Sequence, residues 1–216
     1  MIWVRYVTAM RVIDTGEMQE TLSGSAVCLG YFDGVHRGHM ALIEAARKIA
    51  KREGLLVCVH ALDRSPAQVL HPDRAIPQLT NAESKIRLFE DAHVDVLAVT
   101  PFDDRVRHMP GRFFFEEILL GKLNAKAIVV GDDHRFGYRG DTGSAELAGL
   151  CAGAGVALTV VPRVRLADGT AISSTAIRAA LEQGDLKRAQ EMLGRAPDAE
   201  MLRRCAGEQR EAGKTI

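Results

Sequence analysis

The 216-residue sequence has no run of apolar residues long enough to span a bilayer, and its first ten residues show no signal-peptide pattern. Its 28 basic and 28 acidic side chains balance, so no overall field favours nucleic acid or a membrane surface. The four cysteines show neither CxxC pairing nor regular spacing, which argues against structural zinc. We therefore expect a reduced, cytoplasmic protein that recognises its partner at a local site, without nucleic-acid or membrane partners.

The sequence does contain an alternation of short apolar runs and helical patterns, with 47% hydrophobic residues. The order strand, helix, strand implies right-handed parallel crossovers. We predict the α/β class, with a Rossmann-like doubly wound parallel sheet and helices on both faces. Strands are predicted at 26–29, 55–62, 94–99, 127–130 and 156–161, and helices at 40–50, 80–92, 113–122, 145–152, 175–183 and 186–193.

The first predicted strand and helix are joined by a glycine-rich loop, residues 30–39. Gly30, Gly34 and Gly38 allow a ligand to approach the backbone closely. The free N–H groups and the positive dipole end of the following helix suit a phosphate. His36 and His39 can donate hydrogen bonds to phosphate oxygens and offset charge that develops on them. The loop is therefore predicted to bind and act on a phosphate group.

These two histidines have plainer interpretations as well. The HxxH spacing can hold a metal ion, although no third ligand is apparent nearby. The pair could also be surface histidines without a role. The anion site is the interpretation we adopt, because the glycine pattern, the preceding strand and the following helix all agree with it.

The run GYFDGVHRGH of this loop resembles the HxGH signature of the nucleotidylyltransferase superfamily. Its FDGV lead-in is typical of the FAD synthetase (FMN adenylyltransferase) module of bacterial bifunctional riboflavin kinase/FAD synthetases. The resemblance covers roughly residues 26–195 and implies ATP and FMN as substrates with Mg²⁺. It implies His36, His39 and Arg178 as catalytic residues, and Gly30, Phe32, Asp33, Gly34, Val35, Gly38, Ser173, Ser174 and Thr175 as ATP-binding residues.

A second anion site is predicted in the stretch ISSTAIR, residues 172–178. Ser173, Ser174 and Thr175 place hydroxyls and exposed N–H groups at a helix N-terminus. Arg178 follows Ser174 by four residues on the same face, where it could reach back to a phosphate. An ordinary helix cap would need a single hydroxyl. The stretch matches the family motif, which implies that it holds the β- and γ-phosphates of ATP.

Two further loops follow strands and are expected on the acceptor side of the site. Asp63 comes after the strand 55–62, where the family usually has Phe-Asp-Pro-His-Pro, and it could be a simple loop carboxylate. After the strand 127–130, the family pattern implies roles for Asp133, Arg135 and Phe136, and Asp133 could hold Mg²⁺. His134 replaces the first Phe of that pattern. The adjacent carboxylates could also form a solvated turn.

The resemblance implies in-line attack of the FMN phosphate on the α-phosphorus of Mg²⁺-ATP, with FAD and pyrophosphate as products. Two alternatives stay open: a nucleotidylyltransferase with another phosphorylated acceptor, and a non-catalytic nucleotide- or flavin-binding relative. Residues 1–195 are expected to form the nucleotidylyltransferase domain and residues 196–216 a charged tail without a riboflavin kinase domain. A separate riboflavin kinase would then supply FMN.

Overall fold

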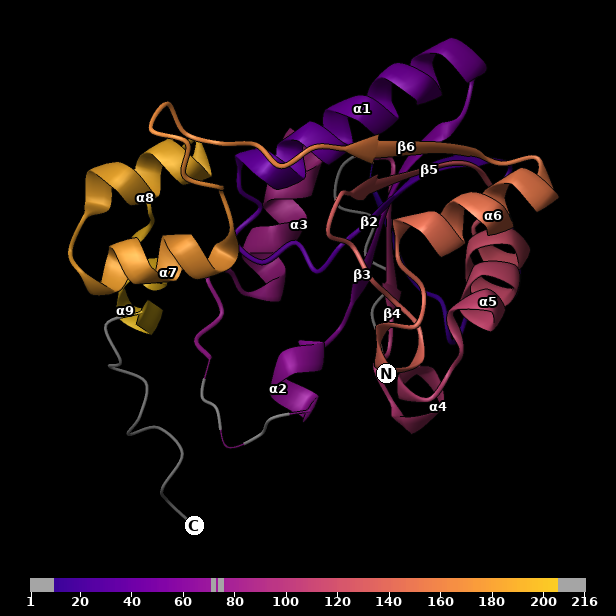
Figure 1. The fold of residues 1–216 in the computed structure, drawn as a ribbon, viewed down its shortest axis with the longest axis horizontal. Helices are drawn as coiled ribbons and strands as arrows, with labels where there is room; N and C mark the ends of the chain where they lie inside the picture. The colour runs from indigo at the N-terminus through magenta and orange to yellow at the C-terminus, as the bar shows by residue number, and fades with distance from the viewer. Residues whose placement is uncertain (1–9, 71–72, 74–75, 206–216) are drawn as a thin grey trace.

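The computed structural model describes residues 10–70, 73 and 76–205, and over these residues six parallel strands form one sheet (Figure 1). The strand order is β1-β4-β3-β2-β5-β6. The predicted doubly wound α/β class is confirmed. The strands are β1 (Arg11–Asp14), β2 (Ser25–Leu29), β3 (Leu56–Leu62), β4 (Val96–Thr100), β5 (Ala125–Gly131) and β6 (Ala157–Val161).

Helices cover both faces of this sheet. They are α1 (Arg37–Glu53), α2 (Pro66–Leu70), α3 (Ala82–Asp91), α4 (Asp104–Arg107), α5 (Gly111–Phe113), the π-helical η1 (Phe114–Lys122), the short 3-10 turn η2 (Tyr138–Gly140), α6 (Ser144–Ala154), α7 (Ser174–Glu182), α8 (Leu186–Leu193) and α9 (Ala199–Cys205). No helix among these described residues is long and apolar enough to cross a membrane.

The two faces of the sheet have separate cores. Ile43 of α1 and Phe89 of α3 are fully buried against one face, while Leu119 of η1 and Leu147 of α6 are buried against the other. Burying each of these side chains stabilises the fold by about 1.5–3 kcal/mol relative to leaving it exposed. Successive residues of β2 and β5 point alternately into the two cores. Both faces of these central strands are therefore buried, and their sequences are mostly apolar.

The strand order places a topological switch between β2 and β5. The chain leaves β2 through α1 toward β3, and leaves β5 through α6 toward β6, on the opposite side. Loops that diverge in this way leave a crevice at the carboxyl ends of the strands, where ligands bind in such sheets. The glycine-rich loop after β2 and the loop after β5 therefore face one another across the crevice.

Helices α7, α8 and α9 gather beside the start of α1 (Figure 1). They enclose a third, smaller apolar cluster that includes Ile177, Met192 and Met201. Met201 and Cys205 of α9 are buried in it, so part of the segment predicted as a charged tail packs against the domain. The remainder, residues 206–216, lies outside the described residues.

Local differences from the predicted boundaries have identifiable causes. Helix α1 starts at Arg37, earlier than predicted, because His36 caps it. It ends at Glu53, because the next residue, Gly54, has a left-handed φ of 66°. Helix α3 begins at Ala82, later than predicted, because Asn81 caps it by accepting a hydrogen bond from Ser84 N. Strand β1 joins the sheet edge within the weakly patterned N-terminal segment, whose apolar run at residues 3–7 lies outside the described residues.

Candidate active site

The glycine-rich loop has an unusual backbone. Phe32, Gly34 and Val35 all have positive φ values, of 55°, 81° and 39°. A side chain at Gly34 would also meet Leu79 at 2.7 Å, so glycine is required there. The loop keeps this strained shape because Phe32 is completely buried and packs edge-on against Phe89, with ring centroids 5.5 Å apart.

Asp33 fastens the loop to the rest of the domain. Its buried carboxylate accepts hydrogen bonds from the backbone N–H groups of Leu79 and Thr80, at 2.9 and 3.2 Å, and forms an ion pair with Arg178. Arg195 donates to the carbonyls of Gly34 and Val35 at 2.6 and 2.9 Å. Asp33 is thus placed to hold the loop in shape.

Arg178 has a different environment from the one expected at the sequence level. Its guanidinium pairs with Asp33 and donates to the Pro77 carbonyl at 2.7 Å, and its side chain is 14% exposed. Among the described residues that line the cavities below, Arg178 does not occur. The four-residue spacing from Ser174 suggested that Arg178 could reach a phosphate at the start of helix α7. In the structure its partner is the buried carboxylate of Asp33. In this structure Arg178 joins the two predicted phosphate motifs.

His36 and His39 cap helix α1 reciprocally. His36 Nδ1 accepts from His39 N and His39 Nδ1 accepts from His36 N, both at 3.3 Å, and the rings stack with centroids 3.7 Å apart. Burial lowers the pKa of His36 to about 4 and the pKa of His39 well below its usual value. Because each Nδ1 is an acceptor in a neutral ring, each ring proton is on Nε2. The two imidazoles are therefore neutral donors.

These histidines line a cavity of about 450 Å³, here called the polar cavity. Helix α7 starts on another side of it: Ser173 caps the helix by accepting from Ala176 N at 3.1 Å, and Ser174 donates to the Asp33 carbonyl at 2.8 Å. Gly30, Gly38 and Thr175 line the same cavity. The N-termini of α1 and α7 thus converge on it, and their dipoles and free N–H groups suit a polyphosphate.

The third side of the polar cavity is the loop after β5. Arg163 donates to Asp132 at 3.3 Å and to Asp133 at 2.7 Å. The described residues include no group of three His, Cys, Asp or Glu side chains that could hold a metal ion. A carboxylate here can supply one ligand to an ion that a polyphosphate already carries, which is how Mg²⁺ is commonly bound.

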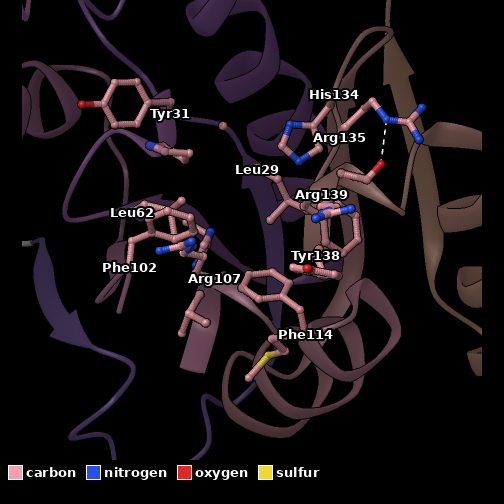
Figure 2. Close-up of a pocket in the computed structure, with 18 of the residues that line it drawn as sticks. Leu29, Tyr31, Leu62, Phe102, Arg107, Phe114, His134, Arg135, Tyr138 and Arg139 are labelled. Carbon is pink, nitrogen blue, oxygen red and sulfur yellow. Dashed lines mark hydrogen bonds between the residues drawn. The ribbon is translucent and has the colours of Figure 1, made fainter. Parts of the chain in front are cut away.

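A second cavity, of about 600 Å³, lies at the ends of β2, β3 and β5 and is here called the aromatic cavity (Figure 2). A volume of this size accommodates a drug-sized ligand. Its walls carry aromatic rings, and arginines occur around it. Its side chains include Tyr31, His60, Leu62, Phe102, Arg107, His108, Phe114, His134, Arg135, Phe136, Tyr138 and Arg139.

Three residues predicted for the acceptor side contribute to this cavity. Asp63 accepts from Phe102 N at 2.7 Å and so fixes a ring of the wall. Arg135 lines the cavity and donates to the Gly140 carbonyl at 2.8 Å, the bond drawn in Figure 2. Phe136 packs against Phe114 with centroids 5.5 Å apart. Phe114 is buried, whereas the preceding Phe113 is 52% exposed.

Sequence reasoning missed several side chains of the aromatic cavity. Tyr31 accepts from Gln78 at 2.9 Å and carries the Lys85 ammonium 4.5 Å from its ring centroid. His60 is buried on β3 and bonds Thr100 at 2.8 Å; burial lowers its pKa to about 3. A histidine at the end of an apolar strand was the available signal for His60. The exposed Arg107 and Arg139 carry no local signal, because the fold alone brings them to the cavity.

The two cavities meet. Leu29, Gly30, Tyr31, His134 and Arg135 line both of them, at the carboxyl ends of β2 and β5. A phosphate-bearing molecule in one cavity can thus reach a polyphosphate in the other. The arrangement suits a transfer reaction between a polyphosphate and an acceptor that has an apolar, aromatic part.

Comparisons with known proteins agree with this geometry. The FAD synthetase family matches residues 18–176. The chain is 33% identical over 178 residues to a bifunctional riboflavin kinase/FMN adenylyltransferase of Escherichia coli K12, covering 82% of this chain and 56% of the relative. It is 34% identical to the protein of the same description from Bacillus subtilis, covering 82% and 55%. The chain thus spans about half the length of these relatives.

Solved structures are similar as well. A macrolide-efflux protein from Streptococcus pneumoniae has a TM-score of 0.76 at 31% identity, covering 86% of this chain and 71% of that chain. A pantoate-beta-alanine ligase from Francisella tularensis, complexed with beta-gamma ATP and beta-alanine, has a TM-score of 0.55 at 15% identity. The match covers 90% of this chain and 84% of that chain. The second likeness concerns the fold alone.

Proposed function

The chain belongs to the FAD synthetase family, and from this premise we propose that it is an FMN adenylyltransferase, which transfers AMP from Mg²⁺-ATP to the phosphate of FMN. The observation that supports this most directly is the meeting of the polar and aromatic cavities at Gly30 and His134. ATP would place its phosphates in the polar cavity, and the flavin ring would occupy the aromatic cavity. Products are FAD and pyrophosphate.

The reaction is a displacement at the α-phosphorus. An oxygen of the FMN phosphate forms the new P–O bond while the bond from the α-phosphorus to the bridging oxygen breaks and pyrophosphate leaves. The attacking phosphate is ionised at neutral pH, so no general base is required. Positioning and electrostatic stabilisation therefore supply most of the rate enhancement.

The histidines of the glycine-rich loop would stabilise the charge on the α-phosphate. In the free protein His36 and His39 are neutral, with Nε2–H as the donor. A neutral donor in a buried site keeps its strength because water does not compete with it. The backbone N–H groups near Gly38 add to the same anion site.

The N-terminus of α7 would hold the β- and γ-phosphates through the hydroxyls and N–H groups of Ser173, Ser174 and Thr175. We assign a positioning role to Phe32, Asp33, Gly34 and Val35, since they shape the loop from beneath. Arg178 would act with them through its ion pair to Asp33.

Magnesium would enter with ATP, neutralising charge on the phosphates. Asp133 fits as a single ligand on the edge of the polar cavity, provided that Arg163 yields its 2.7 Å contact. On the acceptor side, Tyr31, Phe102, Phe114 and Tyr138 offer faces and edges for a planar ring.

The proposal extends to the source of the acceptor. The relatives' description joins riboflavin kinase to FMN adenylyltransferase, so a riboflavin kinase activity would supply FMN to this site. We place the nucleotidylyltransferase domain at residues 1–195, with α9 packed onto it. A cytoplasmic location fits the four cysteines, which are all buried free thiols.

The test is pyrophosphate release by the purified protein with Mg²⁺-ATP and FMN, riboflavin, other phosphorylated acceptors, or no acceptor. We expect release that requires FMN, together with FAD identified by chromatography. Release with another phosphorylated acceptor and not with FMN would change the substrate. Binding of ATP without release under any condition would overturn the transferase assignment.

A further inference from the structure

His134 stands out among the residues at the junction of the cavities. Among the buried side-chain nitrogen and oxygen atoms of the described residues, two lack a hydrogen-bond partner: Nε2 of His134 and Nε of Arg204. Buried polar atoms in folded proteins are almost always paired, so each exception calls for an explanation. His134 lines both cavities, and its own chain gives Nε2 no partner.

The imidazole is held in place by its surroundings. The backbone N–H of His134 donates to the Gly131 carbonyl at 3.2 Å, which closes the turn after β5. Its ring is inclined by 29° to that of Phe136, with centroids 5.8 Å apart, and Phe136 in turn packs against Phe114. Figure 2 shows the imidazole next to Leu29. Both residues line the polar cavity as well as the aromatic cavity.

Position and chemistry together suggest a ligand for this nitrogen. In the proposed reaction the two cavities meet where the acceptor's phosphate approaches the α-phosphorus. The apolar wall of Leu29 and Phe136 offers nothing to a phosphate, whereas an imidazole can donate a hydrogen bond to it. A phenylalanine at this position, as in the family pattern, could not.

On the basis of the proposed function, we propose that His134 binds the phosphate of the acceptor, and that it raises the preference of this site for a phosphorylated flavin over riboflavin. It is a specificity-determining residue that holds the attacking group at the junction. The transfer itself is unchanged by this assignment: no proton is moved and no bond is made to the imidazole.

The experiment compares equilibrium binding of FMN and of riboflavin, followed by the quenching of flavin fluorescence without ATP. In His134→Phe we expect Kd for FMN to rise about tenfold while Kd for riboflavin changes less than about twofold, because a hydrogen bond to a charged group is lost. His134→Gln, which keeps an N–H donor, should stay within about threefold of the wild type for FMN.

His108→Phe is the matched control. His108 lines the same cavity, but its Nδ1 already bonds the Asp104 carbonyl at 2.8 Å. Its substitution should leave the ratio of the two dissociation constants unchanged. Thermal unfolding of each variant shows whether the fold is retained. If His134→Phe is unfolded, binding of FMN and riboflavin is compared in His134→Gln and in a third variant, His134→Leu.

Each outcome is decisive. Equal weakening of FMN and riboflavin would mean that His134 contacts the ring system or the linking chain, and it would overturn the inference. Unchanged FMN binding in all His134 variants would overturn it too, while FAD formation by the wild type would leave the proposed function standing. A wild type that binds neither flavin would remove both.

Discussion

The polar and aromatic cavities are built in different ways. The wall of the polar cavity is held by a network of polar contacts. A single residue of this network, Asp33, bonds to Leu79, Thr80 and Arg178. The aromatic cavity depends on single contacts, such as the bond from Phe102 N to Asp63, and on exposed groups such as Arg139. The cavity that we propose for the phosphates is thus fixed by the fold, while the cavity that would choose the acceptor depends on individual residues.

The largest effect is expected beneath the polar cavity. Asp33→Ala would leave Arg178 buried without its partner, and breaking such a pair typically costs about 3–5 kcal/mol of unfolding free energy. Pyrophosphate release should be lost with it. Urea unfolding measures the change. The control is Glu44→Ala, which removes a surface pair with Arg47 and should cost at most about 1 kcal/mol. Equal losses of unfolding free energy in the two variants would show that the Asp33 network does not stabilise the polar cavity more than a surface ion pair would.

Substitution of His39 is expected to lower kcat without a comparable loss of stability. His39→Ala removes an Nε2–H donor from the polar cavity, and kcat should fall by about 10²–10³, as when one oxyanion donor is deleted. Single-turnover FAD formation and the thermal midpoint are measured together. His39→Asn, which keeps an amide donor, should recover part of the rate. A near-normal kcat in the alanine variant would remove His39 from the mechanism.

Acid should weaken both regions, because both bury neutral histidines. Burial lowers the pKa of His36 and of His134 to about 4 and that of His60 to about 3, against about 6.5 when unfolded. Between these values the unfolded chain binds more protons, so stability is lost as the pH falls from about 6.5 toward 4. Each such group contributes up to about 1.4 kcal/mol per pH unit.

Calorimetry from pH 8 to pH 4.5 tests this dependence. Asp168, whose pKa hydrogen bonds lower to about 2, loses its contribution mainly below about pH 4.5 and does not explain a change between about pH 6.5 and 5. His60→Asn should reduce the slope. A thermal midpoint that stays constant down to pH 5 would contradict the burial of these imidazoles as neutral groups.

The smallest effect is expected at the aromatic cavity. Asp63→Ala frees Phe102 N, and the displaced ring should raise KM for FMN about fivefold, the worth of one hydrogen bond, with KM for ATP unchanged. Steady-state kinetics with each substrate varied in turn separates the two constants. A shift in KM for ATP of equal size would show that the two cavities are less independent than their construction implies.

The same contrast explains what the sequence could predict. The glycine-rich loop and the ISSTAIR stretch are each contiguous in the sequence, so both could be recognised there, and residues of both line the polar cavity. The ion pair between Arg178 and Asp33 has no signal in the sequence, because the two residues lie 145 positions apart. His60, Arg107 and Arg139 went unnoticed because they meet only when β3, α4 and the loop after β5 come together. Five of the six strands were predictable because they are apolar runs, whereas the edge strand β1, with the mixed sequence RVID, was not predicted.

The glycine-rich loop also has a consequence for synthesis on the ribosome. Its shape depends on Thr80, Arg178 and Arg195, which lie 46, 145 and 160 positions from Gly34, Asp33 and Val35, the loop residues that they hold. A nascent chain that has emerged as far as β5 would already carry both histidines, yet Arg178 of α7 and Arg195, which follows α8, would still be missing. We expect such a chain to be unable to bind ATP, so that nucleotide binding reports the arrival of Arg195.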